Sequence, residues 1–317
     1  MTAGARVTRR GLLAGAVAAS FARRSAAAEA SRPWRSFELA VPTDARGARR
    51  ALVVLPSDAL DKAPLPLLVL LHGLGETNDE HAGTHAWLER YGLARAWEQL
   101  HGQALPRPQP SFLSEPEYEA RGRCLSRRPF AGLCVVCPYL PPPRLTQASD
   151  PKFERYASWL SDALLPAVRD RVPEASRDRE QTGIAGVSLG GLVALHAGLA
   201  GAQHYATVGS VQGAFGVDQA TNLARRLAAS FRGPGRAIYV ATSAFDPYRA
   251  ANQLLARRLA AEGVQSELCL RNGPHSQTWL REVGSVDLLL WHDRALRSAP
   301  SLSNSSSPAN TDSCCVR

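Results

Sequence analysis

A serine framed by glycines carries the clearest chemistry in this chain of 317 residues. Ser188 lies in the run Gly186-Val187-Ser188-Leu189-Gly190-Gly191, after the apolar pair Ile184-Ala185 and before Leu192-Val193-Ala194-Leu195. This pattern predicts a strand, a sharp turn and a helix, which together form a nucleophile elbow. Gly186 and Gly190 suit such a turn, because neighbouring backbone approaches these positions too closely for a side chain. We therefore expect Ser188 to be a nucleophile; the alternative is an ordinary glycine-rich connection.

A serine hydroxyl needs a histidine base and a carboxylate that orients the base, because the hydroxyl alone is a poor nucleophile at neutral pH. Both follow Ser188 in the order serine, acid, histidine. Asp246 comes a short loop after the apolar run 237–241, and His275 a short loop after the run 267–270. The carboxyl ends of parallel strands are where open α/β sheets build their sites. The predicted catalytic triad is Ser188, Asp246 and His275.

Other histidines and acids are weaker candidates. His196 lies inside the helix expected after the elbow, His204 near the start of the next strand and His292 late in the final helix, so each is expected to be structural or solvated. Asp218 follows a strand and stays open as an alternative acid, whereas Asp287 comes after the histidine and breaks the expected order.

An oxyanion hole is expected from two backbone N–H groups, and losing one such donor typically costs about 3 kcal/mol in the transition state. Leu189 supplies one by its position after the nucleophile. The loop Leu71-His72-Gly73-Leu74-Gly75 supplies the other, assigned to Leu74 with Gly75 as the neighbouring option. His72 is interpreted as a loop-shaping residue and not as the base.

Short apolar runs alternate with longer helical patterns from residue 36 onward, which predicts an α/β protein with a mostly parallel, eight-stranded sheet and helices on both faces. One helix is expected over 153–171, bent at Pro166. A single domain is expected over 29–298. The predicted strands are 37–41, 51–55, 65–71, 134–137, 182–185, 207–211, 237–241 and 267–270.

Residues 76–130 form a long insertion after the third strand. We expect a helix around 87–100 and then an irregular segment to about Arg128, which contains the proline-rich run 106–110. Long insertions of this kind are often lids or pocket walls, but a surface loop with no role is equally compatible with the sequence.

The two ends of the chain predict export and disorder. Residues 1–28 combine paired arginines, a short apolar stretch and small residues, which indicates a twin-arginine-like export signal and a periplasmic or extracellular location. A basic N-terminus that stays attached is the alternative. Residues 299–317 are rich in serine and asparagine and are expected to be disordered.

The cysteines and the charge exclude several functions. Cys134 and Cys137 lie within one apolar strand, where their side chains should face apart, so no metal site is expected at this pair. A disulfide from Cys124 to either of them stays open.

The net charge of +9 comes from scattered arginines, which argues against nucleic acid binding. The apolar stretch near the N-terminus is too short to span a bilayer as a mature helix, so no stable membrane insertion is expected.

These motifs give the chain a family resemblance. The run Trp159-Leu160-Ser161-Asp162-Ala163-Leu164-Leu165-Pro166-Ala167-Val168, the elbow, the Asp246 loop and Gly273-Pro274-His275 followed by Trp279 resemble the putative-esterase family of α/β hydrolases. That family includes esterase D-like, enterochelin esterase-like and feruloyl esterase-like enzymes, together with the mycolyltransferases. The long insertion departs from the family pattern.

The resemblance implies hydrolysis of a carboxylic ester through an acyl-enzyme on Ser188, without a metal or organic cofactor. The substrate would be a small-molecule or polymer-linked ester. Acyl transfer or peptide hydrolysis by the same triad is the nearest alternative. A catalytically inactive, exported binding protein is an alternative of another class. The oligomeric state is not indicated by the sequence.

Overall fold

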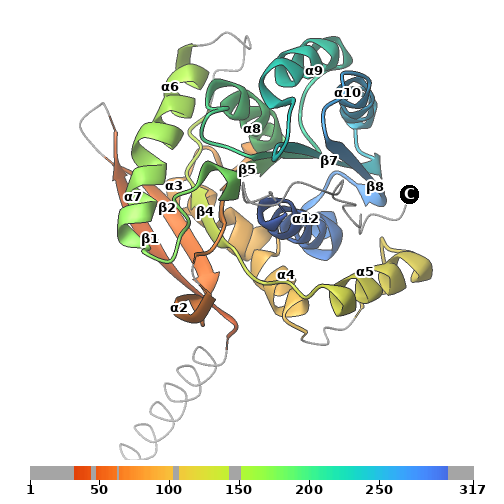
Figure 1. The fold of residues 1–317 in the computed structure, drawn as a ribbon. Coiled ribbons are helices and arrows are strands. Elements are labelled where there is room, and N and C mark those ends of the chain that lie inside the picture. The colour runs from red at the N-terminus through yellow and green to blue at the C-terminus, as the bar shows by residue number, and fades with distance from the viewer. Residues whose placement is uncertain (1–31, 44–47, 63, 103–106, 143–150, 299–317) are drawn as a thin grey trace, which may run out of the picture. The chain divides into compact units, whose positions relative to one another are not determined.

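The computed structural model describes residues 32–43, 48–62, 64–102, 107–142 and 151–298 (Figure 1). The predicted export signal and C-terminal tail lie outside these residues. No helix in the described part of the chain has the length and apolar character needed to cross a bilayer.

Eight strands form one sheet in the order β1-β2-β4-β3-β5-β6-β7-β8. The pairs β1/β2 and β2/β4 are antiparallel, and every other neighbouring pair is parallel. This confirms the predicted sheet. The strands are β1 (Trp34–Pro42), β2 (Ala48–Pro56), β3 (Leu67–Leu71), β4 (Cys134–Pro138), β5 (Thr182–Val187), β6 (Thr207–Val211), β7 (Ala237–Phe245) and β8 (Ser266–Pro274).

The central strands are buried along their whole length, as their continuous apolar sequences require. The edge strand β8 instead alternates between buried and exposed residues over its C-terminal part. Strands β7 and β8 run on past their apolar runs, to Phe245 and Pro274. Both extensions end directly before a predicted site residue, so the sheet itself carries Asp246 and His275.

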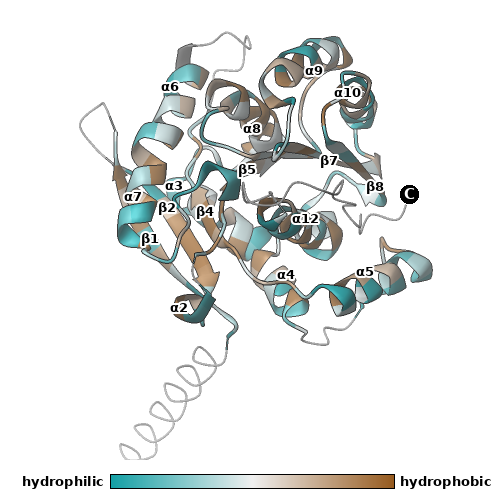
Figure 2. Cartoon of the chain, in the orientation of Figure 1, coloured by the Kyte–Doolittle hydropathy of each residue, from teal (hydrophilic) through white to brown (hydrophobic). Residues whose placement is uncertain are grey.

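Helices cover both faces of the sheet, as predicted, and each face has its own apolar core. One core packs α6 (Pro151–Trp159), η3 (Leu160–Leu164), α7 (Leu165–Arg171), α8 (Leu189–Ala200), α9 (Val217–Phe231) and α10 (Arg249–Ala261). The other packs η2 (Ala86–Arg90), α4 (Leu93–Leu100), α11 (Gln277–Trp279), η5 (Leu280–Gly284) and α12 (Ser285–Arg297). Figure 2 shows apolar residues concentrated on the strands between these two layers.

The remaining elements are α2 (Ala59–Lys62), η1 (Leu74–Glu76), α3 (Glu80–His85), α5 (Glu115–Arg127) and η4 (Arg179–Gln181). The helix expected over 153–171 is present as α6, η3 and α7 without a break. The irregular turn of this continuous helix is the π-helical η3, and Pro166 follows it as the second residue of α7.

Helix α5 corrects the prediction that the insertion is irregular to about Arg128. The Ser114 N–H donates to Glu117 at 2.8 Å, and a proline follows in the first turn, so the helix has a strong start signal. Its sequence is rich in charged residues, Figure 2 colours much of it as hydrophilic, and an apolar periodicity is almost absent. The predicted helix over 87–100 is present as η2 and α4.

The cysteines in β4 behave as expected. Cys134 packs in one core and Cys137 in the other, and both are buried free thiols. Burial raises the pKa of Cys134 to about 12, so its thiol stays protonated. Cys124 is disulfide-bonded, but neither Cys134 nor Cys137 is its partner, so a bridge from Cys124 to this pair is excluded.

Candidate active site

Ser188 occupies a strained turn between β5 and α8. Its backbone has φ 55° and ψ −117°, a conformation that costs a non-glycine residue free energy and that clusters at functional sites. Gly186 and Gly190 make the turn fit, because a Cβ on Gly186 would lie 2.3 Å from the Gly190 carbonyl oxygen. The strand, turn and helix of the predicted nucleophile elbow are all present.

Asp246 and His275 lie together at the ends of β7 and β8. The Asp246 Oδ1 atom is 2.9 Å from His275 Nδ1. The same carboxylate accepts hydrogen bonds from the Thr242 hydroxyl at 2.6 Å and from the Tyr248 N–H at 3.0 Å. A buried carboxylate held at three points can fix the imidazole with Nδ1–H toward Asp246, leaving Nε2 as the acceptor of a proton.

The Ser188 side chain is partly exposed, and its hydroxyl makes no hydrogen bond to any described residue. The structure thus joins two of the three predicted triad residues by a direct contact. Contacts between a nucleophile and its base are often long without substrate. The assignment of all three residues as one triad remains a prediction.

Gln212 links the loops that carry these residues, and sequence reasoning missed it. Its backbone has φ 47°, and its N–H donates to the Ala241 carbonyl at 2.6 Å. Its side-chain amide donates to Ser243 Oγ at 2.7 Å and to the Pro274 carbonyl at 3.1 Å. Gln212 therefore ties the end of β6 to the residue before His275. Its place directly after a buried strand was the available signal.

The loop after β3 packs against the elbow, as expected for an oxyanion loop. A Cβ on Gly190 would lie 2.4 Å from both the His72 and Leu71 carbonyl oxygens. Leu74 and Leu189 each begin a helical element, and N–H groups at such positions have no intrahelical acceptor. Both are thus suited to the predicted role of donors to an oxyanion.

His72 shapes this loop and is too buried to act as a base. Its Nε2 accepts a hydrogen bond from the Leu140 N–H at 2.9 Å, so its Nδ1–H donates to the Gly73 carbonyl at 2.8 Å. Burial lowers the pKa of His72, which keeps the ring neutral in this arrangement.

Tyr91 and Glu76 support the same loop from the insertion and were not predicted. The Gly73 N–H donates to the Tyr91 hydroxyl at 3.1 Å, and that hydroxyl donates to Glu76. Burial, and then the Glu76 carboxylate, raise the pKa of Tyr91, so the phenol keeps its proton. Gln277, two residues after His275, donates to Glu76 at 3.5 Å. Glu76 thus connects the loop after β3, which carries the predicted donor Leu74, with the segment that follows His275.

The rival histidines are placed as predicted. His292 is fully buried and bonded to Thr207 at 3.0 Å, and burial lowers its pKa to about 3. His196 packs against Phe153, and burial lowers its pKa to about 4. His204 lies partly exposed in a turn.

The rival acids lack a contact with a histidine in the described structure. Asp218 is exposed in the first turn of α9. Asp287 is buried between Arg121, at 2.8 Å, and Arg271, at 3.3 Å. Asp287 is therefore part of a structural ion network, and Asp246 is the acid that the geometry favours.

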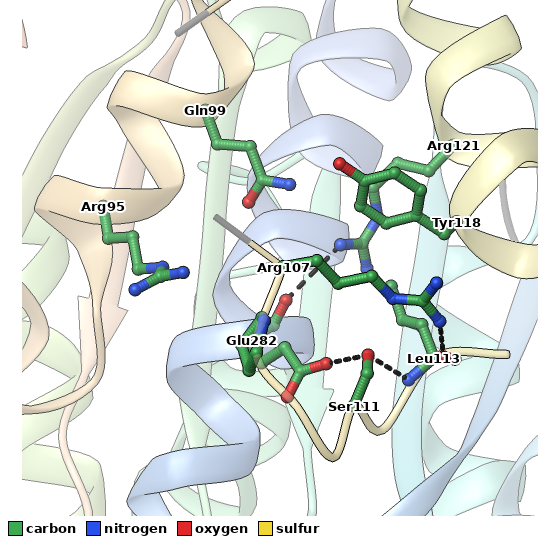
Figure 3. A pocket seen from close by; sticks show the side chains of 9 residues that line it. Arg95, Gln99, Arg107, Ser111, Leu113, Tyr118, Arg121 and Glu282 are labelled. Atoms are coloured by element: carbon green, nitrogen blue, oxygen red, sulfur yellow. Dashed lines mark hydrogen bonds between the residues drawn. The ribbon is translucent and has the colours of Figure 1, made fainter. Parts of the chain in front are cut away.

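The insertion also packs behind the histidine loop. In the pocket of Figure 3, the Ser111 hydroxyl donates to the Glu282 carboxylate. The backbone N–H of the next residue, Phe112, donates to the same carboxylate oxygen at 2.9 Å. Phe112 is thereby placed so that a Cβ on Gly273 would lie 2.9 Å from its ring. Gly273 has φ 118°, so only glycine fits this loop comfortably. Part of the insertion is therefore a wall that supports the loop before His275.

The sheet order, the elbow and the flanking helices are those of the α/β-hydrolase fold. Residues 141–282 match the protein family described as putative esterase, which confirms the resemblance seen in the sequence motifs. No curated protein sequence matches the chain.

Solved structures with the same fold include a ferulic acid esterase, with a TM-score of 0.61 and 16% identity over 84% of this chain and 100% of that chain. An S-formylglutathione hydrolase from Staphylococcus aureus has a TM-score of 0.54 and 15% identity over 82% and 96%. The enterobactin esterase from Shigella flexneri has a TM-score of 0.52 and 20% identity over 81% of this chain and 59% of that chain. At these identities the likeness concerns the fold.

Proposed function

We propose that this chain is a serine esterase that hydrolyses a carboxylic ester through an acyl-enzyme on Ser188. The observation that carries the proposal is the contact of 2.9 Å between Asp246 and His275. These residues follow β7 and β8, whose carboxyl ends lie at the same edge of the sheet as the end of β5, where Ser188 lies. The family match and the esterases among the structures of like fold agree with it.

The reaction follows from the roles of these groups. His275 Nε2 takes the proton of the Ser188 hydroxyl as Ser188 Oγ attacks the ester carbonyl carbon, and Asp246 stabilises the imidazolium that forms. The N–H groups of Leu74 and Leu189 stabilise the oxyanion. His275 then protonates the leaving alcohol, and the acyl-enzyme remains. Water, deprotonated by the same histidine, releases the acid and restores Ser188.

Apolar side chains at the edge of the site indicate the kind of ester. Three apolar side chains are largely exposed: Leu74 (56%), Val217 (52%) and Phe245 (73%). All three lie at the carboxyl edge of the sheet, where Leu74 follows β3, Val217 follows β6 and Phe245 ends β7. On the edge of the sheet that carries Ser188, exposed apolar groups favour a substrate with an apolar acyl or aryl portion. Export to the periplasm or the cell exterior is part of the proposal and rests on the sequence of residues 1–28.

The test compares purified protein with Ser188→Ala on p-nitrophenyl acetate, butyrate and octanoate. We expect hydrolysis by the unaltered protein only, and labelling of Ser188 by a fluorophosphonate probe. Equal release of nitrophenol by both proteins would refute Ser188 as the nucleophile. Absence of labelling together with absence of hydrolysis would favour an inactive binding protein, and ester formation with an added alcohol would favour acyl transfer.

A further inference from the structure

Two histidines and a glutamate meet on the surface away from the predicted triad. Glu38 lies in β1, and His81 and His85 lie four residues apart on one face of α3. One oxygen of Glu38, Oε1, is 3.7 Å from His81 Nδ1 and 3.5 Å from His85 Nε2. The three ligand atoms all lie within 4.8 Å of one another.

These separations suit a metal ion with tetrahedral coordination. Ligands about 2.1 Å from a zinc ion and at tetrahedral angles are about 3.4 Å from each other. The two distances from Glu38 are close to that value, so small side-chain movements would bring the three atoms to coordination distance. Two histidines and one carboxylate are a ligand set that proteins use for zinc, with water in the fourth position.

Contacts around the cluster orient its ligands. His85 Nδ1 is 3.1 Å from the His81 carbonyl, and a proton donated there leaves the lone pair of Nε2 facing Glu38. The other Glu38 oxygen, Oε2, faces the Arg50 guanidinium at 3.5 Å. Ion pairing at Oε2 leaves Oε1 as the oxygen that faces both histidines.

We propose that Glu38, His81 and His85 form a binding site for a divalent transition metal ion of the zinc class. Imidazole nitrogen prefers such ions over magnesium or calcium, which take oxygen ligands. The His81 and Glu38 side chains are 63% and 39% exposed, so an ion reaches the site from solvent. The site lies outside the proposed catalytic groups and does not depend on the esterase proposal.

The metal would act as a brace between the edge strand and the insertion. Helix α3 packs on the histidine of the oxyanion loop, since a Cβ on Gly83 would lie 2.6 Å from His72 Nε2. A metal that joins α3 to β1 therefore holds the helix on which this loop rests. Binding to the folded state alone raises the melting temperature.

The experiment uses the full chain without a histidine tag, treated with chelator and dialysed. Calorimetric titration with zinc chloride is run on the unaltered protein, His81→Ala, His85→Gln and the control His204→Ala, which removes a histidine from a turn elsewhere in the fold. Circular dichroism checks that each variant is folded. Melting temperatures are measured with zinc and with magnesium.

We expect the unaltered protein and His204→Ala each to bind zinc at one site with the same affinity. In His81→Ala and in His85→Gln the affinity for zinc should be at least ten-fold lower. Zinc should raise the melting temperature of the unaltered protein and of His204→Ala by several degrees, and magnesium should leave it unchanged. Equal zinc affinity in all four proteins, or an equal response to magnesium, would overturn the proposal. Because hydrolysis is not measured, failure here is independent of the esterase assignment.

Discussion

The Gly73 N–H donates a hydrogen bond of 3.1 Å to the Tyr91 hydroxyl, and that hydroxyl donates a hydrogen bond to the Glu76 carboxylate. This chain of contacts fixes the loop whose next residue is Leu74. The loop also touches the nucleophile, since a Cβ on Gly73 would lie 3.7 Å from Ser188 Cβ. Under the proposed function, we therefore predict that Tyr91 is a positioning residue, which acts through the backbone of the loop predicted to hold the oxyanion.

Replacing Tyr91 with phenylalanine removes the acceptor of Gly73 and the donor to Glu76 from a buried place. We expect kcat for p-nitrophenyl butyrate to fall roughly ten-fold with little change in KM, less than the hundred-fold or greater loss of an oxyanion donor itself. The free energy of unfolding should fall by about 1–3 kcal/mol. Tyr118→Phe, in the same insertion, is the control. A change in KM alone would contradict the positioning role.

The elbow should tolerate no side chain at Gly190. Gly190→Ala forces a Cβ to within 2.4 Å of two carbonyl oxygens, that of Leu71 at the end of β3 and that of His72 in the loop after it. We expect loss of nearly all hydrolysis and a lower urea midpoint, because backbone must move apart. Gly122→Ala in α5, outside the proposed site, is the matched control, since a Cβ there meets nothing within 4 Å. Similar losses in both variants would show that close packing is not the cause.

Asp246 should matter through the imidazole tautomer. An asparagine at this position can present an N–H to His275 and favour the wrong tautomer, so Asp246→Asn should lower kcat about 10³- to 10⁴-fold with the fold intact. Asp218→Asn tests the rival acid and should retain activity. Hydrolysis rates and circular dichroism of both variants decide between them. Loss of activity in Asp218→Asn alone would transfer the role.

The sequence predicted the sheet because its buried strands have continuous apolar runs, and the elbow because Ser188 is framed by glycines at fixed spacing. It did not reveal Gln212, Tyr91 or Glu76, whose roles depend on partners brought together by the fold. Tyr91 and Gly73, for example, share no local pattern. Helix α5 was missed for another reason, since its charged surface lacks the apolar periodicity that identifies helices.

The cluster of Glu38, His81 and His85 illustrates the same limit. The spacing of the two histidines is visible in the sequence, but such a pair is common on exposed helices. The third residue, Glu38, comes from an edge strand far earlier in the chain. Only the packing of α3 against the sheet brings Glu38 Oε1 to 3.7 Å from His81 Nδ1 and 3.5 Å from His85 Nε2.

His292 should make the fold sensitive to acid. Burial lowers its pKa to about 3, against about 6.5 for an exposed histidine. Between these values the unfolded chain binds more protons than the folded one, so stability is lost as pH falls below about 6.5, by up to about 1.4 kcal/mol per pH unit. The full contribution of neutral His292 is present above that pH.

His292→Gln removes this titration while keeping a polar partner for Thr207. We expect the advantage of the unaltered protein in unfolding free energy to shrink by about 2 kcal/mol between pH 7 and pH 5, measured by urea denaturation at each pH. His204→Gln, in a partly exposed turn, should show the same pH dependence as the unaltered protein. If the difference between His292→Gln and the unaltered protein stays constant over this range, the buried neutral ring is not a source of acid sensitivity.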